Sequence, residues 1–250
     1  MSEILLGINS VLEALKANRK VRVIHIARDK SDDRLQAILQ VAKDKRIKVV
    51  RDDKAALERL ASSKFHQGIV AEAEPYRYYS LEDILEQAGD QGEAPLLLLL
   101  DGVEDPQNLG AIIRTAECLG AHGVVIPRHG ACAVTPAVTR ASAGASEHLK
   151  VAMVTNLVSA IKELKRQGIW IVGTDSQAPV SCYDLAFPEP VALVTGGEGS
   201  GIRRLVKENC DLMVNIPMKG RVNSLNASVS SAIVLAEVVR QRRAAAEANG

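Results

Sequence analysis

The chain has 250 residues, of which 47% are hydrophobic and 24% charged, and its formal net charge is +1 at pH 7. This composition is typical of a globular protein and excludes wholesale disorder. The length favours two domains over one. The longest apolar run, residues 95–100, is far shorter than the roughly 18–20 residues that span a bilayer, and the N-terminus lacks a signal-peptide pattern. We therefore expect a cytoplasmic protein.

The cysteines and histidines do not predict a metal site. The 4 cysteines form no C-x-x-C pair and the 5 histidines form no H-x-x-x-H pair. Isolated cysteines of this kind are typically small buried or half-buried thiols. Metal catalysis and a disulfide scaffold are therefore not expected.

The charges are distributed unevenly along the chain. Residues 1–75 hold 15 Lys and Arg against 11 Asp and Glu, residues 76–94 hold 1 against 5, and residues 95–250 hold 15 against 14. The first segment is therefore basic, the second acidic and the third nearly neutral. This distribution indicates two domains with different functions, joined by an acidic linker. We predict a small domain over residues 1–75, a linker over 76–94 and a second domain over 95–250.

Helices and strands alternate through the first domain, which predicts a small α/β unit. The apolar spacing predicts helices near residues 9–15, 34–43 and 55–60, and strands over 21–26, 47–50 and 68–73. Residues 74–80 break this pattern, and a short helix near 81–87 is expected within the linker.

From Pro95 onward the strands are continuous apolar runs, as in a parallel sheet whose two faces are both covered. Strands are predicted over residues 96–100, 123–126, 169–173, 191–194 and 212–216, with helices near 109–119, 157–166, 202–207 and 225–243. This pattern predicts an α/β domain with its ligand at the carboxyl ends of the strands.

The first unusual strand-to-helix junction contains Asn108, Gly110 and Arg114. Asn108 stands where a helix N-cap is expected, and Gly110 allows a ligand or another segment to approach closely. Arg114 lies in a helix of mostly apolar and small residues, where a guanidinium usually has an anionic partner. A capping Asn with a structural Arg is the plain alternative.

The second junction runs from a strand through Gly196, Gly197, Glu198, Gly199 and Gly201 into a helix. Such a loop offers backbone amides to a ligand, but it lacks the Lys and Ser/Thr that close a P-loop. Glu198 would repel a pyrophosphate. An uncharged or cationic ligand fits this loop better.

The third junction follows Ile216 and contains a dense run of Asn and Ser over residues 223–231, which includes Ser224 and Asn226. So many small polar side chains disfavour a buried helix start unless they bind something. A capped helix with a small-residue packing face is the alternative.

In this order, the three junctions resemble the three motifs of the SpoU/TrmH family of RNA ribose 2′-O-methyltransferases. The motifs are Asn-Leu-Gly-x-x-x-Arg at 108–114, Gly-x-Glu-x-x-Gly at 196–201, and Ile-Pro-Met at 216–218 with Ser-Leu-Asn-x-Ser-Val at 224–229. Residues 7–15 and 66–69 resemble the N-terminal substrate-binding domain of the family's ribosomal-RNA branch, which methylates a guanosine ribose in 23S rRNA.

The resemblance implies a C-terminal knotted (trefoil, SPOUT-type) α/β methyltransferase domain behind a smaller α/β RNA-binding domain, although knots are rare. It also implies S-adenosylmethionine as cofactor and a homodimer with the site near the subunit interface. By motif position, the cofactor would be held by Gly196, Ile216 and Leu225. The reactive site would consist of Asn108, Arg114, Glu198, Ser224 and Asn226.

Arginine is a poor base near neutral pH because its pKa exceeds about 12. We therefore expect Arg114 to bind the RNA phosphate and to polarise the hydroxyl. The proton acceptor is left undecided among a phosphate oxygen, water and Glu198.

The excess of positive charge in residues 1–75 suits contacts with RNA phosphates. Aromatic residues are 3% of the chain, so base stacking is not expected as the main device. Tyr76, Tyr78 and Tyr79 are candidates for stacking on RNA, although docking of the linker onto one domain is the favoured interpretation of this cluster.

Other classes of function stay open. A nucleotide-dependent oxidoreductase would need pyrophosphate at the glycine loop, and a non-catalytic RNA-binding assembly factor could carry the same motifs. Within the enzyme class, methylation of tRNA or of another rRNA site is the alternative.

Overall fold

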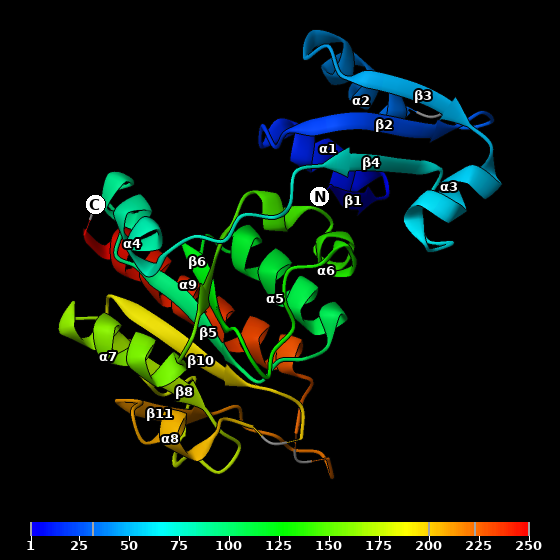
Figure 1. Ribbon diagram of the computed structural model, residues 1–250. Coiled ribbons are helices and arrows are strands. Elements are labelled where there is room, and N and C mark those ends of the chain that lie inside the picture. Colours follow the sequence, from blue (N-terminus) through cyan, green and yellow to red (C-terminus); the bar gives the residue numbers. More distant parts are fainter. Residues whose placement is uncertain (1, 32, 200, 223, 250) are drawn as a thin grey trace. The chain divides into compact units, whose positions relative to one another are not determined.

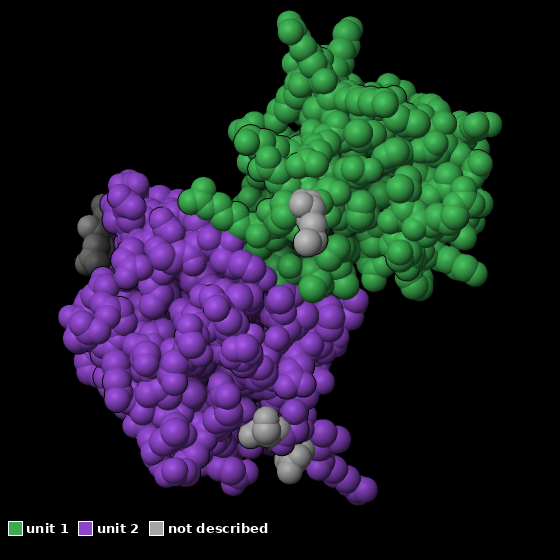
Figure 2. Space-filling view, viewed as in Figure 1, with its two compact units in different colours: residues 1–77, 134–148 green, residues 78–133, 149–250 purple. Residues whose placement is uncertain are grey.

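The computed structural model describes residues 2–31, 33–199, 201–222 and 224–249 (Figure 1). The chain forms two compact units (Figure 2). Unit 1 comprises residues 1–77 and 134–148, and unit 2 comprises residues 78–133 and 149–250. The described helices include none with the length and apolar character needed to cross a bilayer.

Unit 1 is built on a four-stranded mixed sheet in the order β1-β4-β2-β3. β4 is antiparallel to both β1 and β2, and β3 is parallel to β2. The strands are β1 (Glu3–Leu6), β2 (Val21–Ala27), β3 (Lys48–Asp52) and β4 (Ile69–Ala73), and the helices are α1 (Ile8–Lys16), α2 (Asp33–Asp44) and α3 (Lys54–Ala61). The buried sides of α1 and α2 share one apolar core with the sheet, and Leu57 of α3 belongs to a second, smaller core.

The segment 134–148 also belongs to unit 1, although it is far from the other residues of that unit in sequence. It contains α6 (Pro136–Ala141) and a short 3-10 helix (Ala145–Glu147), and α6 packs against β1 and α1. Prediction had placed this segment within a domain over residues 95–250. The compact units divide the chain differently because Val134, Val138 and Ala145 bury their side chains.

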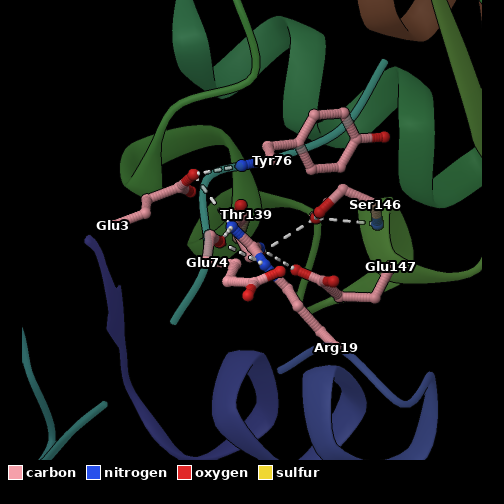
Figure 3. Close-up of polar contacts among 8 residues, drawn as sticks. Glu3, Arg19, Glu74, Tyr76, Thr139, Ser146 and Glu147 are labelled. Atoms are coloured by element: carbon pink, nitrogen blue, oxygen red, sulfur yellow. Dashed lines mark hydrogen bonds and ion pairs between the residues drawn. The ribbon is translucent and has the colours of Figure 1, made fainter. Parts of the chain in front are cut away.

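A buried ionic network ties this segment to the rest of unit 1 (Figure 3). The Arg19 guanidinium lies 2.6 Å from the Glu147 carboxylate and 2.8 Å from that of Glu3, and it donates 3.0 Å and 2.7 Å hydrogen bonds to the Glu74 carbonyl oxygen. The side chains of Arg19 and Glu147 are only 9% and 4% exposed. Burial raises the pKa of Glu147, and the neighbouring Arg19 opposes that shift.

Unit 2 is built on a seven-stranded parallel sheet in the order β7-β6-β5-β10-β8-β11-β9. The strands are β5 (Leu96–Asp101), β6 (Gly123–Pro127), β7 (Lys150–Val154), β8 (Trp170–Thr174), β9 (Val180–Ser181), β10 (Val191–Gly196) and β11 (Leu212–Asn215). β5, β6 and β10 consist almost wholly of buried residues, as the unbroken apolar runs predicted. Since all strands are parallel, their carboxyl ends meet at one edge.

Helices cover both faces of this sheet (Figure 1). The helices of unit 2 are α4 (Leu81–Asp90), α5 (Pro106–Cys118), α7 (Leu157–Arg166), α8 (Arg204–Lys207) and α9 (Ala227–Asn249). α4 and α7 share one apolar core with the side chains of Leu97, Leu99 and Val194. α5 and α9 lie against each other and contact β6 and β10.

Two local predictions were wrong. The short helix expected near residues 81–87 is present as α4, but its assignment to a linker was wrong. It belongs to unit 2, because Leu81, Ile84 and Ala88 bury one side of it and a capping box between Ser80 and Asp83 fixes its start. Asn108 is not an N-cap. α5 begins earlier, at Pro106, and the side chain of Asp105 accepts a hydrogen bond from the amide of Gln107.

Candidate functional site

A cavity of about 660 Å³ lies at the carboxyl edge of the parallel sheet. The ends of β8, β10 and β11 and the start of α9 form its walls. The predicted cofactor residues Gly196, Ile216 and Leu225 all line it, as do Glu198, Ser224 and Asn226 of the predicted reactive site. The volume falls in the range of small-molecule sites, about 300–1,000 Å³.

The glycine loop after β10 approaches other backbone segments too closely for any side chain. A Cβ on Gly197 would lie 1.8 Å from the carbonyl oxygen of Gly102, which follows β5. A Cβ on Gly196 would lie 2.1 Å from the carbonyl carbon of Gly201. The Gly197 amide donates a 2.8 Å hydrogen bond to the carbonyl oxygen of Asp101. The glycines therefore serve close backbone packing that shapes one wall of the cavity.

A buried carboxylate anchors the far end of the same loop. Asp101 is fully buried and accepts two 2.7 Å hydrogen bonds from Arg203, one from its amide and one from Nε. The Nη2 atom of Arg203 lies 2.5 Å from the same carboxylate. The loop is thus fixed to β5 at both of its ends.

Asn108, Glu198 and Asn226 form a hydrogen-bonded cluster. The Asn226 amide nitrogen donates 2.9 Å hydrogen bonds to Asn108 Oδ1 and to Glu198 Oε1, and Asn108 Nδ2 also donates to Glu198 Oε1. Asn108 is 6% exposed, whereas Glu198 and Asn226 are exposed. Three segments that are up to 118 residues apart in sequence therefore meet at one polar cluster.

Asn226 has a second task at the start of α9. Its Oδ1 accepts hydrogen bonds from the amides of Ser228 at 2.9 Å and Val229 at 3.3 Å, and from the Ser228 hydroxyl at 2.6 Å. One turn later, the buried Ser231 hydroxyl donates to Thr195 Oγ1 at 3.0 Å. Part of the Asn and Ser run is therefore helix capping and packing, which was the plain alternative for this segment.

The cavity wall also carries an ion pair between Lys207 and Asp175. The hydrogen bond from Lys207 lowers the pKa of Asp175, and a hydrogen bond from the backbone amide of Gln177 adds to the shift. Asp175 and Glu198 thus place two carboxylates on the wall of the same cavity. Because Lys207 balances the charge of Asp175, the excess negative charge on the described part of the wall comes from Glu198, and it favours an uncharged or cationic ligand.

Arg114 stands apart from this cluster. Its side chain is exposed on α5 and does not line the cavity, and it makes no hydrogen bond or ion pair with any other residue that the structure describes. With about 3.6 residues per helical turn, position 114 points roughly 120° away from position 108. The chain by itself brings together seven of the eight predicted site residues and leaves out Arg114.

Within the described parts of the chain, no group of three or more His, Cys, Asp or Glu could hold a metal ion. The site instead suits a nucleoside-like cofactor. The buried backbone of the glycine loop approaches the cavity without side chains, and Ile216 and Leu225 supply apolar contact beside the polar groups of Thr195 and Ser230.

Sequence families match both parts of the chain. The SpoU rRNA Methylase family matches residues 95–236, and the family described as RNA 2′-O ribose methyltransferase substrate binding matches residues 4–79. A protein of Bacillus subtilis that is named as a TrmH family tRNA/rRNA methyltransferase, YacO, is 42% identical over 242 residues, which are 97% of this chain and 97% of the relative.

Two solved structures have the same fold over almost the whole chain. The SpoU methyltransferase AviRb from Streptomyces viridochromogenes, solved in complex with AdoMet, has a TM-score of 0.82 at 27% identity and covers 96% of this chain and 90% of its own. A crystal structure described as an RNA 2′-O ribose methyltransferase has a TM-score of 0.78 at 26% identity and covers 96% and 88%.

Proposed function

Since the chain belongs to the SpoU/TrmH family of RNA methyltransferases, we propose that it transfers a methyl group from S-adenosylmethionine to a ribose 2′-hydroxyl of structured RNA, namely a guanosine in 23S rRNA. The observation that carries this proposal is the cluster of Asn108, Glu198 and Asn226 beside the glycine-walled cavity. Polar side chains from three motifs converge there on the place where a ligand can enter.

The fold and the cofactor do not depend on the choice of RNA. The predicted fold class, a knotted SPOUT-type α/β methyltransferase domain with a smaller α/β domain before it, is confirmed by the likeness to SpoU methyltransferases. The predicted cofactor, S-adenosylmethionine, is confirmed by the family and its AdoMet-bound relative.

The wall residues fit this cofactor. S-adenosylmethionine, when bound, supplies an electrophilic methyl group on a positively charged sulfur. Backbone groups of the loop that begins at Gly196 would hold polar atoms, and Ile216 and Leu225 would pack against apolar ones. The carboxylate of Glu198 favours a positive charge in the cavity, whereas Asp175 is already paired with Lys207.

The cluster can position the ribose. Asn108 and Asn226 hold Glu198 Oε1 by two donated hydrogen bonds, so the carboxylate keeps one orientation while the side chain stays exposed. An exposed carboxylate in a fixed place can accept a hydrogen bond from a ribose hydroxyl and, in the reaction, its proton. Ser224 lies on the same wall and can orient the sugar. Such positioning supplies much of the rate in a reaction between two bound groups.

We assign Arg114 to the RNA. Its exposed guanidinium suits a phosphate, and the fixed fork of donors can also polarise a hydroxyl. Because Arg114 does not reach the cavity of its own chain, we propose that the homodimer brings it to the cavity of the second subunit. This arrangement places the complete site near the subunit interface.

The choice of 23S rRNA rests on the N-terminal part of the chain. Residues 4–79 match the substrate-binding family, and residues 7–15 and 66–69 resemble the ribosomal-RNA branch. Methylation of tRNA is the second candidate, because the relatives are named for both kinds of RNA. A non-catalytic assembly factor would bind the same RNA without turnover.

Mapping ribose methyl groups tests the target. Total rRNA and tRNA are compared between cells with and without this protein, by the resistance of 2′-O-methylated linkages to alkaline cleavage. We expect one guanosine of 23S rRNA to lose its methyl group. Loss of a tRNA methyl group alone would select the second candidate, and unchanged rRNA and tRNA would reject a methyltransferase role on either.

Two substitutions test the roles of the residues. We expect Arg114→Ala to abolish methyl transfer and to leave cofactor affinity in calorimetry nearly unchanged, because Arg114 contacts RNA. Asn226→Ala should lower the rate through both the cluster and the α9 cap. Arg166→Ala, an exposed arginine on α7, is the matched control and should keep the wild-type rate. Full activity of Arg114→Ala would refute its assignment.

A further inference from the structure

An exposed aromatic ring stands out on unit 1. The side chain of Phe65 is 70% exposed, more than that of Tyr79, Trp170 or Tyr183. Leaving a ring of this size in water forfeits the favourable free energy of its burial, about 25 cal/mol per Å² of apolar surface. The mechanism proposed above makes no use of this residue.

The loop that carries Phe65 is held by local hydrogen bonds. The Phe65 amide donates to Ser63 Oγ at 3.2 Å, and the Gly68 amide donates to Nδ1 of the buried His66 at 3.1 Å. The His66 carbonyl oxygen accepts from the Ile69 amide at 2.9 Å, where β4 begins. The ring is therefore presented to solvent by a loop with a defined conformation.

Arg140 covers one face of the ring. Its guanidinium carbon lies 5.1 Å from the ring centroid of Phe65, and it comes from α6, which belongs to the same unit. With the ring 70% exposed, the remaining face is open. A ring with an arginine stacked on it and a free face is suited to take the flat face of a nucleic-acid base.

A basic cavity begins two residues further along the same loop. Gln67 lies within about 7 Å of Phe65 along the chain, counted between Cα atoms. It lines a cavity of about 780 Å³ together with Ile8, Asn9, Lys30, Asp33 and Arg34. Two cationic side chains face one carboxylate there, so the cavity favours an anion such as a phosphate. Lys64, next to Phe65, adds a further exposed cation.

The start of α1 contributes to the same cavity. Gly7 precedes the helix with φ +89, a conformation that favours glycine, and the Ile8 amide donates a 3.3 Å hydrogen bond to Gln67 Oε1. This bond joins the beginning of α1 to the loop that carries Phe65. The same short loop therefore carries the ring of Phe65 and contributes Gln67 to the basic cavity.

We propose that Phe65 and Arg140 form a stacking platform for one unpaired base of the RNA substrate, with Arg34 holding a neighbouring backbone phosphate. The inference rests on the proposed function in taking RNA as the ligand, and it specifies that unit 1 recognises a single-stranded part of that RNA. A base and its phosphate match the pairing of an open ring with a nearby basic cavity.

The test uses the full chain and a single-stranded octamer of uridine that carries one 5-iodouridine, with an RNA duplex of the same length for comparison. We expect tighter binding of the single strand and a photocrosslink that peptide mapping assigns to Phe65. Phe65→Ala and Phe65→Leu should each weaken binding about 5-fold to 100-fold, the usual cost of one lost base stack. Phe65→Trp should retain the affinity, because only a ring is needed.

Salt titration separates the two parts of the platform. Phe65→Ala should leave the slope of log affinity against log salt unchanged, whereas Arg34→Ala should reduce it by about 0.7, the value for one phosphate contact on a single strand. Tyr183→Ala, an exposed aromatic residue of unit 2, is the matched control and should bind as the wild type does.

Several outcomes would overturn the platform. These are equal affinity for duplex and single strand, unchanged affinity of Phe65→Ala, or a Phe65→Ala variant that changes only its sedimentation, which would indicate a protein contact. The proposed function is measured separately, by methyl transfer. Binding of the octamer through Phe65 without any methyl transfer to rRNA or tRNA would reject that function and leave the platform standing.

Discussion

The cavity of unit 2 and the surface around Phe65 in unit 1 differ in how their polar and aromatic side chains are held. At the cavity of unit 2, Asn108, Glu198 and Asn226 bond to one another, and the carboxylate of Asp101 is bonded to Arg203. On the surface of unit 1, Phe65 leaves most of its ring in water, and Lys30 and Arg34 line an open basic cavity. The first surface is held by contacts among its own residues, whereas the second leaves most of the Phe65 side chain accessible to solvent.

This difference matches the ligands that we propose for the two units, S-adenosylmethionine for unit 2 and RNA for unit 1. A small cofactor must be placed within a fraction of an ångström of the reacting oxygen, so its walls must be rigid before it arrives. A long polyanion is bound by several weak contacts that add up, so the groups can remain hydrated until RNA displaces the water. Substitutions in the cavity wall of unit 2 should therefore abolish cofactor binding outright, whereas substitutions of exposed residues in unit 1 should each weaken RNA binding only in part.

The most abrupt effect is expected at Gly197. Gly197→Ala would place a Cβ 1.8 Å from the carbonyl oxygen of Gly102, and neither backbone can move without distorting the wall of the cavity. We expect loss of S-adenosylmethionine binding in calorimetry and a strongly lowered melting temperature. Gly89→Ala in α4, where an added Cβ meets nothing within 4 Å, is the matched control and should be neutral or stabilising by up to about 1 kcal/mol. If Gly197→Ala bound the cofactor with normal affinity, the cavity wall of unit 2 would not need the rigid backbone packing that we infer for it.

Unit 1 has its own rigid part, which the Arg19 network tests. Arg19→Met leaves the buried Glu147 and Glu3 carboxylates without their cation, so we expect about 3–5 kcal/mol of destabilisation. Hydrogen exchange should speed up in β1 and α6 and stay slow in β10. Lys16→Met removes an exposed ion pair of the same unit and should cost under about 1 kcal/mol. Equal effects of the two substitutions would show that the network does not hold the segment 134–148.

The sequence predicted most of unit 2 because its signals are local. The strands are unbroken apolar runs, and Asn108, Gly196, Glu198 and Asn226 stand at strand-to-helix junctions, where parallel topology brings them together. The prediction placed the start of α5 at Asn108, whereas the angle of roughly 120° between positions 108 and 114 holds only when both residues lie within the helix. That start is set by Asp105 and Pro106 and not by Asn108.

The errors of prediction come from long-range packing. Residues 134–148 are rich in small residues and carry no strong period, so nothing local shows that they pack on β1 and α1. α4 was assigned to a linker because of its acidic residues, while its apolar side supplies Ile84 to the core. The prediction also lacked three strands, β1, β7 and the two-residue β9. Phe65 was overlooked because a low aromatic content of the whole chain says nothing about the exposure of one ring.

A smaller and asymmetric effect is expected at the Asp101 and Arg203 pair. In the variant Arg203→Leu, the fully buried Asp101 carboxylate keeps the hydrogen bond from the backbone amide of residue 203 but loses those from the guanidinium. We therefore expect about 3 kcal/mol of destabilisation. Asp101→Asn removes the buried charge as well, and the Arg203 side chain, 54% exposed, can turn to water. This variant should lose about 1–2 kcal/mol. Chemical denaturation measures both, and the reverse order would show that the guanidinium, not the carboxylate, is the costly group.

The smallest expected effect is a pH dependence of the stability of unit 2 that comes from one buried histidine, His122. His122 is 2% exposed, and its Nδ1 accepts a 3.0 Å hydrogen bond from the Leu96 amide, which requires an unprotonated Nδ1. Burial lowers the pKa of His122, with Arg242 adding to the shift and Glu93, whose carboxylate lies 3.3 Å from Nε2, opposing it.

The sign of this dependence follows from the lowered pKa. Below about pH 6.5 the unfolded chain binds a proton at His122 that the folded chain does not, so the free energy of unfolding falls as the pH drops from 6.5 toward the lowered pKa. Above pH 6.5 the residue contributes no slope. His122→Gln, whose Oε1 can accept the same hydrogen bond, should flatten the decline between pH 6.5 and 5, whereas the exposed His129→Gln should follow the wild type. Denaturant unfolding at several pH values measures this decline in stability. Hydrogen exchange in β5 reports on unit 2 and in β2 on unit 1, so the two units are followed separately. A decline that persists unchanged in His122→Gln would assign it to other groups.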